Sequence, residues 1–152
     1  MKSQNFMKLN FPSKSVNESF ARSAVAAFCA QLDPTVEEIN DIKTSVSEAV
    51  TNCVVHAYQK RQSNNDLITI ECKLFPEMLE VIISDNGIGI ANITQAMEPF
   101  YTTEPNSERS GMGFTVMQSF MDKVLVNNQS GGGTVITMQK NFTKDKEKVS
   151  GE

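Results

Sequence analysis

Apolar positions in the first third of the chain recur every three to four residues, which is the spacing of an α-helix. The run Ser15 to Glu18 has the Ser-x-x-Glu form of a capping box and predicts a helix start. A short strand, Lys8 to Phe11, precedes it and is expected to end at Pro12, and Asp33-Pro34 predicts the end of the helix. The residues of this helix that we expect to face the core are Val16, Phe20, Ala24, Ala27 and Phe28.

A second, longer stretch of helical spacing follows. Thr35 to Glu38 forms another capping box, and the apolar spacing continues to about Tyr58. At 3.6 residues per turn, one stripe of this helix is apolar and consists of Ile39, Ile42, Val46, Ala49, Val50, Cys53 and Ala57. Ser45, Glu48 and Asn52 lie roughly opposite that stripe. The helix is therefore expected to rest on the core and to present a carboxylate and a carboxamide, one turn apart, on its free face.

The later part of the chain contains alternating or β-rich runs, which are typical of strands. Leu67 to Phe75 and Met78 to Ser84 are joined at Pro76-Glu77 like a hairpin, and the pattern then loosens from Asp85 to Ser110. The further expected elements are a helical turn near Ile93 to Met97, a helix from Gly113 to Phe120, and strands from Lys123 to Asn127 and from Thr134 to Lys140, joined by a turn at Gln129 to Gly133. This order predicts an α+β fold, a two-layer sandwich in which helices cover one face of a mixed, mostly antiparallel sheet.

Length and composition fit one globular domain. A chain of 152 residues can bury a core without disulfides or metals, and we expect one domain over residues 1–143 and a disordered, charged tail over residues 144–152. The net charge of -4 argues against direct binding to nucleic acid. No long apolar run and no signal peptide are present, so a cytoplasmic protein without a membrane span is expected. Cys29, Cys53 and Cys72 each lie in an apolar segment, which predicts buried free thiols.

Two features carry side chains suited to chemistry. Glu48 and Asn52 form the first, although taken alone they are more simply a solvated helix face. The second is the loop Asp85 to Ile90, Asp-Asn-Gly-Ile-Gly-Ile, directly after a strand. Its carboxylate can accept a hydrogen bond from an amine, and its two glycines let a backbone approach something bulky. An Asp-x-Gly turn is the ordinary alternative, but the two isoleucines favour a pocket lining.

Glycines mark two further features. A glycine pair within Glu108 to Phe114 stands at a predicted helix start, where backbone N–H groups suit phosphate oxygens, and Arg109 could add a charge-assisted contact. Gly131 to Thr134 leads into the last strand and could place a hydroxyl beside Asp85. A mobile loop and a plain hairpin turn are the respective alternatives. The Walker form Gly-x4-Gly-Lys-Ser/Thr is absent, so an ATP site here would be of another kind.

The order of these features is more specific than any one of them. In sequence they are Glu48-x3-Asn52-x3-His56-Ala57-Tyr58, the loop from Asp85 to Ile90, Glu98 to Thr103, Ser110 to Phe114, and Gly131 to Thr134. Over nearly the whole chain this succession resembles the ATP-binding fold of gyrase, the heat-shock chaperone, histidine kinases and the mismatch-repair ATPase. Within that superfamily the chain is most similar to the short serine-kinase branch, the anti-sigma factors of endospore-forming bacteria. The matching stretches are Asn17 to Arg22, Gln31 to Thr35 and Arg109 to Thr115.

The resemblance implies a function and a set of partners. It implies a homodimer that, when loaded with ATP, binds and inhibits a sporulation sigma factor of RNA polymerase. It also implies a serine/threonine protein kinase that uses Mg-ATP to phosphorylate an anti-anti-sigma factor on serine. Glu18 and Arg22 match a helix that the family uses to dock partners, whereas a surface ion pair is the ordinary alternative.

The resemblance also implies roles for individual residues. Glu48 would be the general base, and Asn52 would bind ATP through Mg²⁺, to which it gives a side-chain oxygen. Asp85 would receive the adenine amine, with Thr134 nearby. The other ATP-binding residues implied are Gly87, Gly89, Thr102, Arg109, Ser110, Gly111 and Gly113, of which the last five belong to a lid loop between the sheet and the third helix.

Two other functions remain open. A detached histidine-kinase catalytic domain would need an upstream phosphorylatable histidine, and no histidine precedes His56. A nucleotide-gated module that only sequesters a partner has no need of a carboxylate beside the metal ligand. Glu48 therefore discriminates between sequestration alone and catalysis.

Overall fold

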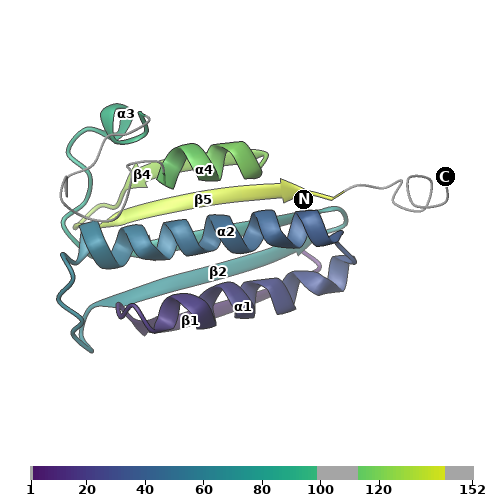
Figure 1. Cartoon of the computed structure of the whole chain (residues 1–152), viewed down its shortest axis with the longest axis horizontal. Coiled ribbons are helices and arrows are strands. Elements are labelled where there is room, and N and C mark those ends of the chain that lie inside the picture. Colours follow the sequence, from purple (N-terminus) through teal and green to yellow (C-terminus); the bar gives the residue numbers. More distant parts are fainter. Residues whose placement is uncertain (1, 99–112, 143–152) are drawn as a thin grey trace.

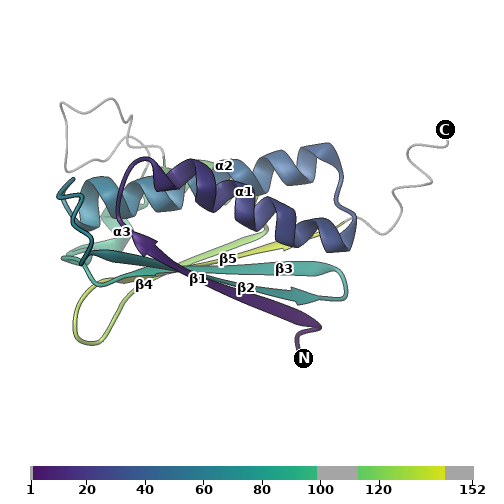
Figure 2. The same ribbon diagram turned by 90° about the horizontal axis from the view of Figure 1, so that it is seen from below.

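The computed structural model describes residues 2–98 and 113–142, and these form two layers (Figures 1 and 2). One layer is a five-stranded sheet, and α1, α2 and α4 pack together on one face of it. The strands are β1 (Asn5–Pro12), β2 (Leu67–Phe75), β3 (Met78–Asp85), β4 (Lys123–Asn128) and β5 (Thr134–Asn141). The helices are α1 (Asn17–Cys29), α2 (Val36–Asn52), α3 (Ile93–Ala96) and α4 (Gly113–Phe120), with a 3-10 turn at Ala30–Leu32 and a π-helical turn at Cys53–Ala57.

The sheet has the order β1-β2-β3-β5-β4, and each neighbouring pair is antiparallel. The predicted α+β sandwich is thus confirmed. The sheet was predicted to be mixed and mostly antiparallel, and among the described strands it is antiparallel throughout. Strand alternation explains the layering. On β2 the residues Ile68, Ile70, Cys72 and Leu74 are buried beneath the helices, while their neighbours face the other side.

The three cysteines are buried and free, as predicted. Burial raises the pKa of the Cys29 thiol to about 11 and that of Cys72 to about 12, so both remain protonated at neutral pH. They act as small apolar core residues rather than as nucleophiles.

Helix α2 begins as its sequence predicts. The Thr35 hydroxyl accepts a hydrogen bond from the Glu38 N–H at 3.1 Å, and the Glu38 carboxylate accepts one from the Thr35 N–H at 2.8 Å, which completes the capping box. The predicted apolar stripe faces the core, with Ile39 only partly buried. Ser45 is the exception on the opposite side, because it is fully buried rather than on the free face.

Helix α1 contradicts two predictions. Its N-cap is Val16 without a side-chain hydrogen bond, so Ser15 forms no capping box. Val16 and Phe20 are 77% and 55% exposed, and the buried face consists of Ala21, Val25 and Cys29 instead. Both sets have helical spacing, and of the predicted set Phe28 does pack, partly buried, against the core. Which set is buried is decided by the contacts of α1 with α2 and the sheet, where the side chains of Ala21, Val25 and Cys29 allow a close approach.

The last turn of the α2 segment is π-helical, from Cys53 to Ala57. The helical path therefore reaches Tyr58, as expected, but its final turn is widened. Tyr58 is buried and its hydroxyl donates to the Leu67 carbonyl at 2.6 Å while it accepts from the Asn86 N–H at 2.6 Å. This phenol fixes the end of the helix to the start of β2 and to the loop after β3. The turn and the loop bound the cavity described next.

Candidate nucleotide-binding site

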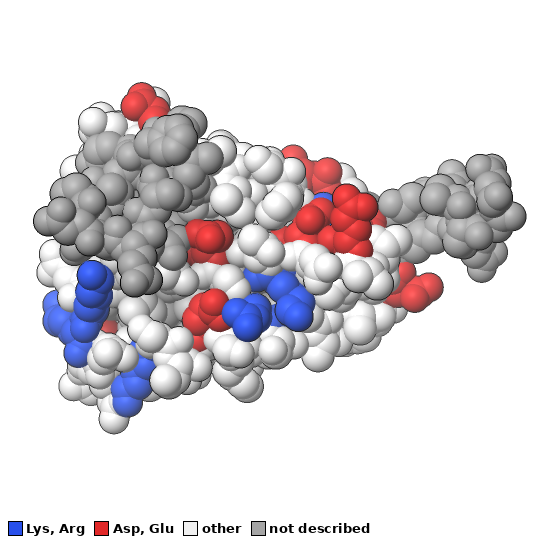
Figure 3. All heavy atoms as spheres, viewed as in Figure 1, with Lys and Arg blue, Asp and Glu red and all other residues white. Residues whose placement is uncertain are grey.

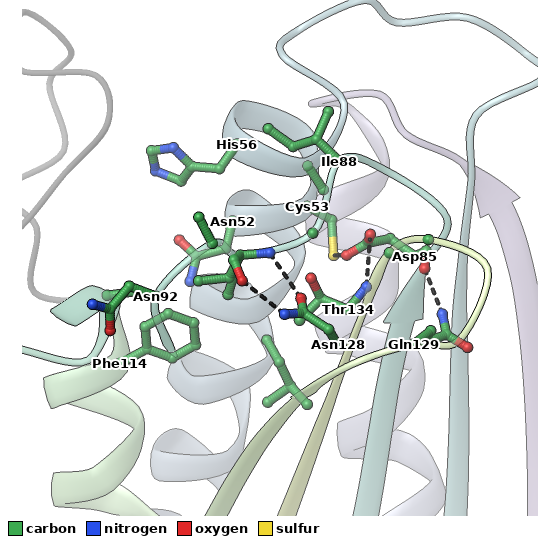
Figure 4. Close-up of a pocket in the computed structure, with 18 of the residues that line it drawn as sticks. Asn52, Cys53, His56, Asp85, Ile88, Asn92, Phe114, Asn128, Gln129 and Thr134 are labelled. Carbon is green, nitrogen blue, oxygen red and sulfur yellow. Dashed lines mark hydrogen bonds between the residues drawn. The ribbon is translucent and has the colours of Figure 1, made fainter. Parts of the chain in front are cut away.

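A cavity of about 550 Å³ lies between the C-terminal end of α2, the loop after β3, α3, the start of α4 and the β4–β5 turn (Figure 4). Asn52, at the end of α2, and Cys53 and His56, in the π-helical turn, form one part of the wall. Residues 88–92 form another part. Cavities of this size accept a nucleotide-sized ligand.

Asp85, at the end of β3, is the buried charged group of this cavity, with 4% of its surface exposed. Its Oδ1 accepts the Gly87 N–H at 2.9 Å and the Thr134 N–H at 3.2 Å. Its Oδ2 receives the Cys53 thiol at the longer distance of 3.5 Å. Burial raises the pKa of the Asp85 carboxyl, and these three hydrogen bonds oppose the rise. The carboxylate is thus fixed in orientation, and Oδ2 keeps acceptor capacity toward the cavity.

Two glycines owe their place to contacts within the protein. A Cβ on Gly87 would lie 2.3 Å from the Ala57 carbonyl oxygen, and one on Gly133, whose φ is +98°, would lie 1.9 Å from the Asp85 carbonyl oxygen. Gly87 does not line the cavity, whereas Gly89 does. The glycine of the Asp-x-Gly sequence thus lets the loop approach the end of the helical segment rather than a ligand. It acts on the site through the loop that carries Asp85.

Glu48, Asn52 and Gly113 come together at the other end of the cavity. A Cβ on Gly113 would lie 3.2 Å from Asn52 Nδ2 and 3.3 Å from Glu48 Oε2. Asn52 lines the cavity, and Glu48 lies one turn earlier on α2, partly buried. The glycine at the start of α4 leaves room for both side chains. The predicted pair on one helix face therefore sits beside the predicted glycine of the third long helix.

The other predicted site residues divide into three groups. Thr134 is buried next to Asp85, where its N–H rather than a hydroxyl bond makes the recorded contact. Glu18 and Arg22 form an ion pair of 2.7 Å on α1 and do not line the cavity. The lid residues lie outside the described residues: Thr102, Arg109, Ser110 and Gly111.

Several residues of the site were not predicted. Asn128 and Gln129, at the end of β4, hydrogen-bond to the loop after β3, and Phe114, Asn92 and Gln95 line the cavity. The sequence around the two amides has the composition of a turn, and their partners lie 38 and 44 positions away. The one available signal was the run of three amides, Asn127 to Gln129, which Ser130 separates from the glycine run.

No group of three or more His, Cys, Asp or Glu side chains arranged to hold a metal occurs among residues 2–98 and 113–142. Asn52 offers one amide oxygen, which fits a Mg²⁺ ion whose other ligands are phosphates and water.

Among residues 2–98 and 113–142, no helix is long and apolar enough to cross a membrane.

Comparison with known proteins identifies the family. A profile described as a histidine kinase-like ATPase domain matches residues 11–140. The anti-sigma F factor of Clostridium beijerinckii is 55% identical over 140 residues, which cover 92% of this chain and 96% of the relative. That of a Thermoanaerobacter species is 52% identical over 146 residues, 96% of this chain and 100% of the relative. The chain belongs to the anti-sigma F factor family.

Solved structures agree with the fold. The RsbU and RsbW domains of a Mycobacterium tuberculosis protein align with a TM-score of 0.62 at 14% identity, over 91% of this chain and 33% of that one. The catalytic domain of the histidine kinase ThkA aligns with a TM-score of 0.55 at 15% identity, over 92% and 99%. In this anti-sigma F factor family member the fold is thus that of an ATPase domain, and the family supports ATP binding.

Proposed function

We propose that this chain is an ATP-controlled anti-sigma factor that also acts as a protein serine kinase in the cytoplasm. The observation that carries the proposal is the cavity itself. A buried carboxylate, Asp85, lies at one end, and a carboxylate and a carboxamide, Glu48 and Asn52, lie at the other beside Gly113. Membership of the anti-sigma F factor family supports the regulatory half of the proposal.

Asp85 would recognise the adenine base. An exocyclic amine is a donor, and the carboxylate is a fixed, buried acceptor whose Oδ1 is already satisfied by two backbone N–H groups. A buried acceptor without an amine opposite would be poorly satisfied. This is a physical reason for a preference for ATP over nucleotides that carry a carbonyl at that position.

Asn52 would hold the metal of Mg-ATP through its side-chain oxygen. The ion, when bound, neutralises phosphate charge during phosphoryl transfer. Lid residues Thr102, Arg109, Ser110 and Gly111 would contact the phosphates together with Gly113. Gly87 and Gly89 would contribute by shaping the loop after β3.

Glu48 would act as the general base. In the proposed step the hydroxyl oxygen of a serine on the substrate protein bonds to the γ-phosphorus, and the bond from that phosphorus to the β–γ bridging oxygen breaks. ADP leaves, and the serine proton goes to the Glu48 carboxylate. A position one helical turn from the metal ligand suits this role, because the base must reach the hydroxyl next to the γ-phosphate.

The proposed partners are a sporulation sigma factor, which the ATP form binds and inhibits, and an anti-anti-sigma factor, which is the phosphorylated substrate. We further propose a homodimer, with Glu18 and Arg22 on α1 in the docking surface. Acidic and basic side chains occur in small separate groups over the helix layer (Figure 3). Such mixed charge suits selection between protein partners.

The test is a pull-down from a lysate of sporulating cells with the full chain as bait, once with Mg-ATP and once with Mg-ADP, followed by incubation with γ-labelled ATP. The expected result is a sigma factor retained with ATP and a small protein retained with ADP that becomes labelled on serine. Retention of a sigma factor without any labelled protein would contradict the kinase and leave a sequestering module. Equal retention with both nucleotides would contradict control by ATP.

A further inference from the structure

The loop after β3 runs from Asp85 to Ile90. Two adjacent amides, Asn128 and Gln129, hold it at both of its ends (Figure 4). Gln129 Nε2 donates to the Asp85 carbonyl oxygen at 2.5 Å, at the start of the loop. Asn128 Oδ1 accepts the Ile90 N–H at 2.8 Å, and Asn128 Nδ2 donates to the Ile90 carbonyl at 2.7 Å, at its end. The side chain of Asn128 thus pairs with Ile90 on both sides, as a neighbouring strand would.

Few other polar contacts hold this wall of the cavity. Within the described part of the chain, the Ile88 N–H donates to the Ala57 carbonyl at 3.1 Å. From residue 89 to residue 98, the recorded hydrogen bonds to the rest of the described domain are the two made by Asn128. Residues of this segment nevertheless form part of the cavity wall. Among the described residues, the hydrogen bonds that attach this segment therefore come from one side chain, while Ile90, Ile93 and Met97 pack against the core.

Two observations indicate that the contact between Asn128 and Ile90 is specific rather than incidental. A Cβ on Gly89, whose φ is +78°, would lie 3.0 Å from Asn128 Oδ1, so a glycine at this position permits the approach. Asn128 is itself solvent-exposed, which means that core packing does not account for an amide here. Its register partner on β5 is Thr134, whose N–H holds the Asp85 carboxylate. Opposite residues of one hairpin thus hold the Asp85 carboxylate and the neighbouring loop at Ile90.

We propose that Asn128 is a positioning residue for the nucleotide site, which holds the wall formed by residues 88–92 at a fixed distance from Asp85. The proposal deepens the proposed function and rests on it. A preformed wall raises affinity because the ligand need not order the loop on binding. Asn128 acts through Ile90, so it governs nucleotide affinity and leaves the chemistry at Glu48 unchanged.

The test uses the full chain with Asn128→Ala and, as a matched control, Asn127→Ala. Asn127 is the same residue type one position earlier on β4, exposed and directed to the other side of the strand. Affinity for Mg-ATP is measured by calorimetry, and exchange of the Ile90 amide hydrogen by NMR. We expect Asn128→Ala to weaken ATP binding by about tenfold and to speed Ile90 exchange, with neither change in the control.

Steady-state kinetics separate positioning from general damage. Asn128→Ala should raise KM for ATP by a similar factor and change kcat by less than about twofold, whereas partial unfolding would lower kcat as well. If Asn128→Ala fails to fold, Asn128→Asp replaces it, because that variant keeps the acceptor for the Ile90 N–H and loses the donor. It should then weaken ATP binding without losing Ile90 protection completely.

The outcomes distinguish this proposal from the one on which it rests. If the unaltered chain does not bind ATP, the proposed function fails. The exchange of the Ile90 amide still reports whether Asn128 holds Ile90. If the unaltered chain binds ATP and Asn128→Ala binds it equally well, the positioning role of Asn128 is overturned. An equal loss in Asn127→Ala would overturn it too.

Discussion

At one end of the cavity, Asp85 is buried and fixed by the N–H groups of Gly87 and Thr134 and by the Cys53 thiol. At the other end, Glu48 and Asn52 lie partly exposed on one face of α2. The first end is complete within the protein, whereas the second offers too few ligands to hold a metal by itself in the described part of the chain. If ATP binds as proposed, the base is therefore recognised by a preorganised group, whereas the phosphate end is completed by the ligand and its metal.

The largest expected effect lies at the phosphate end. Glu48→Gln should lower kcat for serine phosphorylation by roughly 10²- to 10⁴-fold, because the amide cannot accept the proton, and should leave ATP affinity within about twofold. A quenched-flow assay with γ-labelled ATP measures this. Glu37→Gln, an exposed position in the first turn of the same helix, is the control and should match the unaltered chain. Undiminished transfer in Glu48→Gln would remove the base role.

Removal of the metal should separate the two ends. Chelation of Mg²⁺ is expected to weaken ATP binding by about ten- to a hundredfold and to leave adenosine binding unchanged, since adenosine has no phosphates. Asn52→Ala should weaken Mg-ATP binding and reduce the further effect of chelation. Calorimetry with both ligands measures this. A parallel loss of adenosine affinity would show that the ends are not separable.

The difference in stability between the unaltered chain and Asp85→Asn, followed against pH, should report on Asp85. Burial raises the pKa of this carboxyl in the folded state, so the folded protein keeps the proton to a higher pH than the unfolded chain does. The contribution to stability is therefore fully present below about pH 4, the unfolded pKa, and is lost as pH rises through the raised folded pKa. Asp85→Asn should lack this loss.

Urea unfolding of the nucleotide-free protein at a series of pH values, with both chains side by side, measures the difference. The free energy of unfolding of the unaltered chain should fall relative to that of Asp85→Asn as pH rises from about 4. A difference that is constant across the series would contradict a raised pKa for Asp85.

The smallest effect is expected for the thiol beside Asp85. Cys53→Ala removes a hydrogen bond of 3.5 Å and leaves the two shorter backbone contacts in place, so ATP affinity should change by less than about threefold. The melting temperature should fall by an amount that corresponds to about 1 kcal/mol, for the volume lost. Cys72→Ala, equally buried but away from the cavity, is the control for that volume. A large loss of ATP affinity confined to Cys53→Ala would show that the thiol itself takes part in binding the base.

The sequence predicted helix α2 well and α1 poorly, for a physical reason. On α2 one apolar stripe stands alone, and Thr35 and Glu38 form the predicted cap. On α1 two sets of residues have helical spacing, and only the tertiary contact with α2 decides that Ala21, Val25 and Cys29 rather than Val16 and Phe20 are buried. Periodicity reveals that a face exists, but the contacts with neighbouring elements decide which of two competing faces is buried.

The site divides in a similar way. The sequence identified Glu48, Asn52 and Asp85 because each has a motif around it, and the structure brings them to one cavity or its rim. Asn128 and Gln129 were missed because their partners are distant in sequence. The roles of the residues found by resemblance remain predictions. Spacing along a chain predicts local structure, whereas a contact between a strand end and a distant loop requires the fold.

The buried Asp85 carboxylate is proposed to recognise the amine of adenine. This proposal is tested most directly by calorimetry with Mg-ATP and Mg-inosine triphosphate, which differ at that position of the base, on the unaltered chain and on Asp85→Asn. The unaltered chain should prefer ATP on the order of 100-fold, and Asp85→Asn should lose most of that preference. Equal affinity of the unaltered chain for the two nucleotides, or a preference that survives Asp85→Asn, would contradict the claim.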